Sequence, residues 1–254
     1  MNRLLGRRAL IVGGSGGIGA ACAQTFVREG AHVHVVEVSE NADLVRDLGR
    51  AVTVHQMDIT SESAWRSLVQ ELAPAGSVDV LVNAAGISGL RDIESASFEW
   101  WKRFQSINSD GVFLAIHYLL PLLKRAPSAS IVNVGSTLAL KPAADLPAYS
   151  ASKGALRNLT RSVALHCANR GYRIRCNSVH PGSTVTPMML ANLGQTAEEH
   201  AAAMERRMLA HPYARSIGRL ALPEDVANAV LFLSCDESAF VTGIDLPVDG
   251  GATI

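Results

Sequence analysis

Three side chains in the second half of the chain have the types and the spacing that proton transfer to a substrate oxygen requires. Tyr149 and Lys153 stand four positions apart, so in a helix they share one face, and Ser136 comes 13 positions before Tyr149. A tyrosine has a reference pKa of about 10, too high for a base near neutrality, and a neighbouring ammonium favours its phenolate. We therefore predict that Ser136 holds a substrate oxygen while Tyr149 takes or gives the proton.

A glycine-rich turn near the N-terminus predicts dinucleotide binding. The apolar run at residues 9–12 leads into Gly13-Gly14-Ser15-Gly16-Gly17-Ile18-Gly19, and a helical pattern follows. Gly13 would permit the tight turn, Gly17 would let the backbone approach a pyrophosphate, and Gly19 would let helix and strand pack closely. The helix N-terminus would then face the phosphates. The spacing is GxxxGxG rather than GxGxxG, so a purely structural turn is the alternative.

Together these two features predict a nicotinamide-dependent reaction. Hydride would pass between a carbinol carbon and the nicotinamide while Tyr149 moves the proton, and the positive ring of the oxidised cofactor would further favour the phenolate. Tyrosine and lysine at this spacing are usually surface residues. The dinucleotide turn and Ser136 at a fixed distance make the chemical interpretation the better one.

Acidic residues after the second and third apolar runs indicate the form of the cofactor. Glu37 follows the run at 31–36 and could accept from the adenosine ribose hydroxyls, whereas it would repel a 2′-phosphate. No Arg or Lys lies in the glycine turn or at positions 38–40, so we expect NAD rather than NADP. A solvated strand-end glutamate is the alternative. Asp58, after the run at 51–56, is either an adenine-edge acceptor or a turn residue.

Strand-like and helix-like patterns alternate from end to end. Apolar runs predict strands at 9–12, 31–36, 51–56, 78–82, 130–134, 173–179 and 241–248, and helices at 18–28, 98–124, 148–170 and 223–234, with another beginning at Ser61. Short connections between them predict a Rossmann-type α/β fold: one domain over 1–254, with a doubly wound parallel sheet of about seven strands and helices on both faces. Residues 184–218 contain Pro187, Pro212 and four methionines, and we expect an irregular, mobile substrate lid there.

The charge and the cysteine content of the sequence argue against several classes of partner and site. The 23 basic and 23 acidic residues give zero formal net charge with no basic run, so we expect neither nucleic acid nor a membrane surface as partner. The cysteines Cys22, Cys167, Cys176 and Cys235 form no CxxC pair, so we predict buried reduced thiols and no metal site. The first eight residues are too short and polar for a signal peptide, and a cytoplasmic enzyme is the expectation.

Over essentially its whole length the chain resembles a classical short-chain dehydrogenase/reductase. The matching pieces are the glycine turn, Asn83-Ala84-Ala85-Gly86, Asn108, Ser136, Tyr149-Ser150-Ala151-Ser152-Lys153, Asn177, Pro181-Gly182 and Val248-Asp249-Gly250-Gly251. The resemblance implies that Asn108 completes a Ser–Tyr–Lys–Asn tetrad, holding a kink in its helix and a water beside Lys153. It also implies that Lys153 holds the nicotinamide ribose, that Asn83 and Gly86 pack beside the adenosine side, and that Thr186 bonds the carboxamide.

The resulting cofactor-binding prediction extends over several segments. It comprises Gly13, Ser15, Gly16, Gly17, Ile18, Gly19, Glu37, Asp58, Ile59, Asn83, Ala84, Ala85, Gly86, Tyr149, Lys153, Pro181, Gly182, Thr184 and Thr186. Two positions depart from the family pattern, which usually has Thr at Val12 and Asn at Ala84. Neither change removes a group from the reaction, so we expect retained activity.

Three functions are compatible with these residues. An NAD(H)-dependent alcohol dehydrogenase or ketone reductase is favoured, because a dinucleotide sensor would not need the tetrad. A 3-oxoacyl-thioester reductase would be expected to prefer NADP and to carry a basic residue near the glycine turn. Residues 171–181 and 186–189 resemble bacterial 3β/17β-hydroxysteroid and alicyclic alcohol dehydrogenases, which implies a hydrophobic cyclic or steroid-like alcohol as the small-molecule partner.

Some residues have a structural explanation that competes with a functional one. We interpret His180 as a packed or capping histidine rather than a cofactor contact, and Trp100 and Trp101 as packing or subunit-contact residues. The family resemblance implies a homotetramer.

Overall fold

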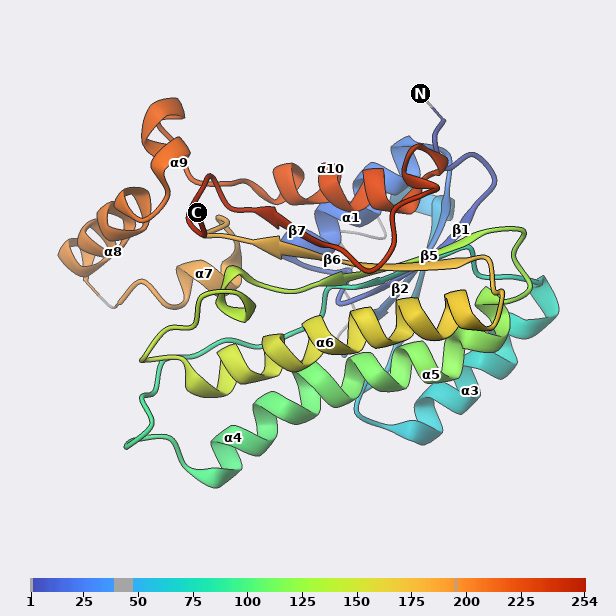
Figure 1. Ribbon diagram of the computed structural model, residues 1–254, viewed down its shortest axis with the longest axis horizontal. Helices are drawn as coiled ribbons and strands as arrows, with labels where there is room; N and C mark the ends of the chain where they lie inside the picture. The colour runs from blue at the N-terminus through green and yellow to red at the C-terminus, as the bar shows by residue number, and fades with distance from the viewer. Residues whose placement is uncertain (1, 39–47, 195) are drawn as a thin grey trace.

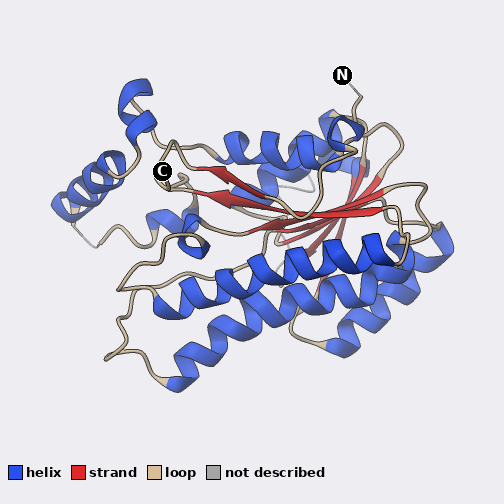
Figure 2. Ribbon diagram, in the orientation of Figure 1, coloured by secondary structure: helices blue, strands red, loops and turns tan. Residues whose placement is uncertain are grey.

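The structure, a computed structural model, describes residues 2–38, 48–194 and 196–254. In these residues seven parallel strands form one sheet in the order β3-β2-β1-β4-β5-β6-β7 (Figure 2), which confirms the predicted fold class. The strands are β1 (Arg8–Val12), β2 (His32–Glu37), β3 (Val52–Gln56), β4 (Val80–Asn83), β5 (Ala129–Val134), β6 (Ile174–Pro181) and β7 (Asp245–Val248). The strand order reverses between β1 and β4, and a crevice for ligands is expected at the carboxyl ends of these strands.

Helices cover both faces of the sheet (Figure 1): α1 and α10 lie on one face, and α3, α5 and α6 on the other. The α-helices are α1 (Gly17–Arg28), α3 (Glu62–Leu72), α4 (Phe98–Gln105), α5 (Gly111–Leu123), α6 (Pro147–Asn169), α7 (Pro187–Leu190), α8 (Ala197–Leu209), α9 (Pro212–Ile217) and α10 (Pro223–Ser234). The π-helical segment η3 (Ser106–Asp110) joins α4 to α5, and short 3₁₀ turns are η1 (Gly49–Ala51), η2 (Ala73–Ala75), η4 (Thr137–Ala139) and η5 (Asp236–Ser238).

The core explains why the strands are apolar on both sides. In β1, Leu10 and Ile11 are both fully buried but belong to different clusters, one on each face of the sheet. A parallel sheet covered by helices on both faces requires this pattern. Helix α3 begins at its N-cap Ser61 and buries Trp65, Leu68 and Leu72, the face that its periodicity predicts.

The prediction that the four cysteine thiols are buried is confirmed. All four thiols are free and buried, and burial raises the pKa of the Cys22 thiol to about 12. A thiol that is buried in apolar surroundings stays protonated and unreactive near neutrality.

The continuous helical stretch Phe98–Leu123 is long and apolar enough to pass a length-and-composition test for a membrane span. Core helices of soluble proteins pass the same test, and here α5 buries Ile116, Leu119 and Leu123 beneath the sheet.

Two predicted segments need correction. The last strand begins at Asp245 rather than at 241, because Gly243 adopts a φ of +75° and its N–H donates to the Cys176 carbonyl outside the ladder. Residues 184–218 are not irregular, since most of them form α7, α8 and α9. Pro187 and Pro212 each stand in a first helical turn, where proline starts a helix instead of breaking it.

Candidate active site

Close backbone contacts build the crevice at the carboxyl ends of β1 and β4. Gly13 follows β1 with a φ of +79°, and a methyl group on it would lie 2.5 Å from the backbone of Ala85. A methyl group on Gly19 would lie 1.9 Å from the Gly13 carbonyl oxygen. Only glycine fits at either position, in agreement with the roles predicted for a tight turn and for helix–strand packing.

The start of α1 is open to an anion. Gly16 precedes the helix without a side-chain cap, and a methyl group on Gly16 would meet nothing within 4 Å. The N–H groups of the first turn carry the positive end of the helix dipole. These residues fit the pyrophosphate of a dinucleotide.

Glu37 is directed back toward the glycine turn. Its carboxylate accepts from the Ser15 N–H at 3.4 Å and from the Val38 N–H at 3.0 Å. The predicted ribose acceptor and the predicted phosphate loop are therefore neighbours in space. The prediction of NAD also used the absence of Arg and Lys at positions 38–40, of which 39 and 40 lie outside the described residues.

Three of the predicted adenosine-side residues use their side chains within the fold. One oxygen of Asp58 accepts from the N–H and the hydroxyl of Thr60, both at 2.8 Å, which is the turn role left open above. Ile59 is buried. The Asn83 side chain, 2% exposed, donates to Asn133 at 2.8 Å inside the sheet. We therefore expect Ile59 and Asn83 to contact a dinucleotide through backbone atoms, if they contact it at all.

Helix α6 presents Tyr149 and Lys153 on one face, as the spacing predicts. The Lys153 Nζ lies 5.8 Å from the centre of the Tyr149 ring and donates to the Val134 carbonyl at 2.9 Å. Aromatic packing also supports Tyr149. The centres of the Phe104 and Tyr149 rings lie 6.5 Å apart with nearly perpendicular planes, and the centres of the Trp100 and Phe104 rings lie 5.0 Å apart. The packing role predicted for Trp100 is confirmed.

Asn108 lies in the π-helical segment η3, so the helix irregularity implied by the family resemblance is present. Its amide group exchanges two hydrogen bonds with the backbone of Ile87, at 2.8 and 3.0 Å, and also donates to the Ser152 hydroxyl at 3.0 Å. A methyl group on Gly86 would lie 3.1 Å from the Asn108 oxygen and 3.4 Å from the Lys153 Nζ. Gly86 thus lies beside the predicted catalytic groups, and its place on the adenosine side of the cofactor stays a prediction.

Ser136 follows β5 and is held by a buried histidine. One ring nitrogen of His180 lies 3.3 Å from the Ser136 nitrogen and 2.9 Å from its carbonyl oxygen, and the other lies 3.0 Å from an Asp245 oxygen. Arg157 donates to the same carboxylate at 2.8 Å. His180 is fully buried, so its interpretation as a packed histidine is confirmed, and it links the strand-end serine to an ion pair on β7.

Burial governs the two titratable groups of the site. It lowers the pKa of Lys153 to about 8. Burial raises the pKa of Tyr149, and a hydrogen bond with Ser136 opposes the rise. In the protein without cofactor, burial outweighs the hydrogen bond, so the pKa of Tyr149 is raised and not lowered as we expected.

Replacing Lys153 with methionine should change how stability depends on pH. The folded pKa of about 8 lies below the ordinary 10.5, so between these values the unfolded chain binds a proton that the folded chain has released. The free energy of unfolding of the wild type, relative to Lys153→Met, should rise through that window by up to about 3 kcal/mol. Urea unfolding of both cofactor-free proteins from pH 7 to 10 measures the difference. A difference that does not change with pH would contradict the lowered pKa.

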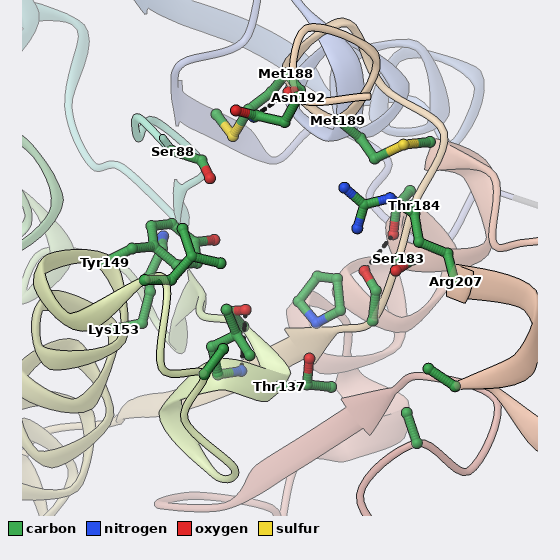
Figure 3. A pocket seen from close by; sticks show the side chains of 18 of the residues that line it. Ser88, Thr137, Tyr149, Lys153, Ser183, Thr184, Met188, Met189, Asn192 and Arg207 are labelled. Atoms are coloured by element: carbon green, nitrogen blue, oxygen red, sulfur yellow. Dashed lines mark hydrogen bonds between the residues drawn. The ribbon is translucent and has the colours of Figure 1, made fainter. Parts of the chain in front are cut away.

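A cavity of about 700 Å³ opens beside these groups (Figure 3). The predicted site residues that line it are Ile18, Ala84, Gly86, Ser136, Tyr149, Lys153, Pro181, Gly182, Thr184 and Thr186. The other predicted site residues do not line it; they are Asn108, Gly13, Ser15, Gly16, Gly17, Gly19, Glu37, Asp58, Ile59, Asn83 and Ala85. Thr186 reaches that turn, since a methyl group on Gly17 would lie 3.1 Å from its side chain.

Sequence reasoning missed several residues that line the cavity. They include Ser88, Leu90, Lys141 and Asp145, and also Asn192, Arg206, Arg207 and His211, which were not singled out within the predicted lid 184–218. Of the four methionines assigned to a lid, Met188 and Met189 line the cavity, whereas Met204 and Met208 do not. No motif marks these positions, because they come from loops and helices whose approach to the site depends on the tertiary fold.

Comparison with known proteins gives a family match over nearly the whole chain. Residues 13–253 match a family model described as "Enoyl-(Acyl carrier protein) reductase". The chain is 38% identical to a cyclopentanol dehydrogenase of a Comamonas species over 260 residues, covering 100% of this chain and 99% of the relative. It is 35% identical to a 3-beta-hydroxysteroid dehydrogenase of Comamonas testosteroni over 252 residues, covering 98% and 96%.

Another relative and one solved structure complete the comparison. An NADP-dependent (R)-specific alcohol dehydrogenase of Lentilactobacillus kefiri is 36% identical over 260 residues, covering 99% of this chain and 98% of the relative. The ligand-free structure of an aldohexose dehydrogenase of Thermoplasma acidophilum superposes with a TM-score of 0.88 at 31% identity, covering 99% of this chain and 96% of that one.

Proposed function

The chain belongs to the short-chain dehydrogenase/reductase family, and on that premise we propose that it is an NAD(H)-dependent oxidoreductase that interconverts a secondary alcohol and a ketone. Alcohol dehydrogenases among its relatives support the reaction class. The observation that carries the proposal is that Ser136, Tyr149 and Lys153 line the same cavity and that Asn108 and Lys153 both approach Gly86.

The reaction divides between the chain and its cofactor. When bound, the nicotinamide accepts or returns the hydride. Ser136, fixed through His180, holds the substrate oxygen, and Tyr149 takes the alcohol proton during oxidation or gives it back during reduction. Lys153 holds the cofactor ribose and supplies a positive charge beside the phenolate as it forms, which offsets part of the desolvation that raises the tyrosine pKa.

NAD is the proposed form of the cofactor. The Glu37 carboxylate already faces the N–H of Ser15, where a 2′-phosphate would be repelled and ribose hydroxyls could donate. The family uses either nicotinamide dinucleotide, and one relative is named as NADP-dependent, so the proposed preference rests on Glu37 and not on the family.

A hydrophobic cyclic alcohol is the proposed substrate class. The relatives named for cyclopentanol and for a hydroxysteroid act on rings, and the cavity that Tyr149 lines includes the apolar side chains of Leu138, Met188 and Met189. A 3-oxoacyl-thioester reductase is the alternative, which the description of the family model keeps open. A non-catalytic dinucleotide sensor is a third possibility.

A substrate panel should separate these functions. We expect oxidation of cyclohexanol or of a 3β-hydroxysteroid with NAD, and affinity for NAD at least tenfold greater than for NADP, about 1.4 kcal/mol. Intrinsic-fluorescence titration measures both cofactors, and absorbance at the NADH band measures turnover. Turnover of only acetoacetyl thioesters would support the alternative reductase, and NAD binding without any turnover would support the sensor. Equal affinity for the two cofactors would overturn the role of Glu37.

We further propose that residues 184–218 cover the substrate. The segment follows β6 at the cavity, and Met188, Met189 and Asn192 face the site from it. Hydrogen exchange with and without NADH and cyclohexanone should show α7 and α8 becoming more protected on binding, because closure expels water from the site. Strong protection in the free protein that does not change on binding would make the segment part of the scaffold.

We also propose an oligomeric state and a cellular location for the protein. Apolar side chains are exposed on α5 and α6, with Phe113 at 51% and Leu165 at 64%, and this supports a homotetramer built on these helices. Light scattering that gives the mass of a monomer would contradict it. We propose a cytoplasmic enzyme whose partner is a small molecule, without nucleic acid or membrane.

A further inference from the structure

Arg207 stands out among the residues that line the cavity, because no hydrogen bond or ion pair with the described part of the chain holds its guanidinium. Within residues 2–38, 48–194 and 196–254 no carboxylate lies within ion-pair distance of it, and its Nε is buried without a hydrogen bond. Figure 3 shows the group projecting into the cavity near Ser183 and Thr184, on the opposite side from Tyr149. A buried polar group without a partner costs free energy unless a ligand satisfies it.

The backbone of Arg207 is fixed by contacts to the end of β6. Its carbonyl oxygen lies 2.6 Å from the Nδ1 of His211, and the Nε2 of the same ring accepts from the Ser183 N–H at 2.9 Å. A methyl group on Gly182 would lie 2.7 Å from that ring. The arginine is therefore anchored to the strand that carries the site, although it belongs to α8.

Positive charge predominates on the cavity wall. Lys141, Lys153, Arg206 and Arg207 line it, whereas Asp145 is the one carboxylate of its described lining. Burial lowers the pKa of Arg207, the neighbouring Arg206 lowers it further, and Asp145 only partly opposes them. An arginine stays protonated under these conditions, so its charge is held in place with incomplete compensation.

From this geometry we infer that the substrate is a hydroxy acid, with an apolar body and a carboxylate that forms a bidentate pair with Arg207. The inference rests on the proposed function, which gives the substrate a hydroxyl that reacts at Tyr149. It adds a carboxylate at the other end of the substrate. A planar guanidinium matches a carboxylate with two parallel N–H···O bonds. Because Arg207 and Tyr149 lie on opposite sides of the cavity (Figure 3), we expect the carboxylate and the reacting hydroxyl at opposite ends of the substrate.

The test uses two probes that differ only in charge, cyclohexanecarboxylate and cyclohexanecarboxamide. Ligand-observed NMR measures their dissociation constants with the NADH-saturated protein. The wild type should bind the carboxylate at least tenfold more tightly than the carboxamide. Arg207→Met should remove that preference without changing the affinity for the carboxamide, and Arg207→Lys should keep part of it because the charge remains and the fork is lost.

Arg215→Met is the matched control, since it removes the same charge from α9 at an exposed position outside the cavity lining. It should keep the carboxylate preference of the wild type. Equal affinity of the wild type for the two probes would overturn the inference, and so would an equal loss of both in Arg207→Met, which would mean that the side chain only packs. Turnover of cyclohexanol is measured separately, so a failure of the proposed function is distinguished from a failure of this inference.

Discussion

Tyr149→Phe should reduce turnover by about a thousandfold or more while leaving the affinity for NADH nearly unchanged. The phenol is the group of the proposed site that we expect to exchange a proton with a substrate oxygen held by Ser136, and phenylalanine preserves the ring that packs against Phe104. The lost interaction is one made in the transition state, so it should appear in kcat rather than in cofactor binding.

Steady-state kinetics with cyclohexanol and a fluorescence titration with NADH measure the two quantities. Tyr172→Phe is the matched control, because that hydroxyl accepts from Lys124 at 3.2 Å at the surface and takes no part in the cavity. It should keep wild-type turnover. If Tyr149→Phe retained a tenth of the wild-type rate, another group would have to move the proton.

Gly19→Ala should lower the free energy of unfolding by about 3 kcal/mol or more and weaken NADH binding at least tenfold. The added methyl group would lie 1.9 Å from the Gly13 carbonyl oxygen, so the backbone of the glycine turn must move. That movement changes the start of α1, whose N–H groups are the proposed phosphate donors. The substitution therefore combines strain in the fold with the loss of a binding geometry.

Gly154→Ala is the control, because it makes the same glycine-to-alanine change where no other group crowds the added methyl. Gly154 lies inside α6, and a methyl group there would meet nothing within 4 Å. Alanine should stabilise this helix by about 0.5–1 kcal/mol, because glycine loses more backbone entropy on folding. Urea unfolding measures both variants. A Gly19→Ala protein as stable as the wild type would mean that the turn adapts without cost and that the close packing is not required.

The pattern of apolar residues was sufficient to predict the seven parallel strands and, to within one residue, both ends of α1, α6 and α10. This succeeds because periodicity and end signals are local: Ser61 caps α3, and Pro223 opens α10 at the predicted residue. The same applies to Gly13, Gly19 and the pair Tyr149 and Lys153. Their spacing along one strand–turn–helix or one helix face already determines how they lie relative to each other.

Local patterns failed where a glycine or a contact with another segment decides the conformation. Residues 241–244 are apolar enough for a strand, yet Gly243 turns the chain and β7 begins later. Residues 184–218 were interpreted as irregular because of their two prolines, although Thr196 and Glu199 form a capping box for α8.

The parts of the site that no spacing predicts are those assembled from distant segments. His180 connects Ser136, 44 positions earlier, to Asp245, 65 positions later, and His211 ties Arg207 to Ser183 across 28 positions. Which side chains meet at such separations depends on the order of the strands and on the path of the connecting loops. For the same reason the motif indicated the role of Tyr149 but not its raised pKa. The burial that raises this pKa comes from segments that pack around the tyrosine in the folded chain.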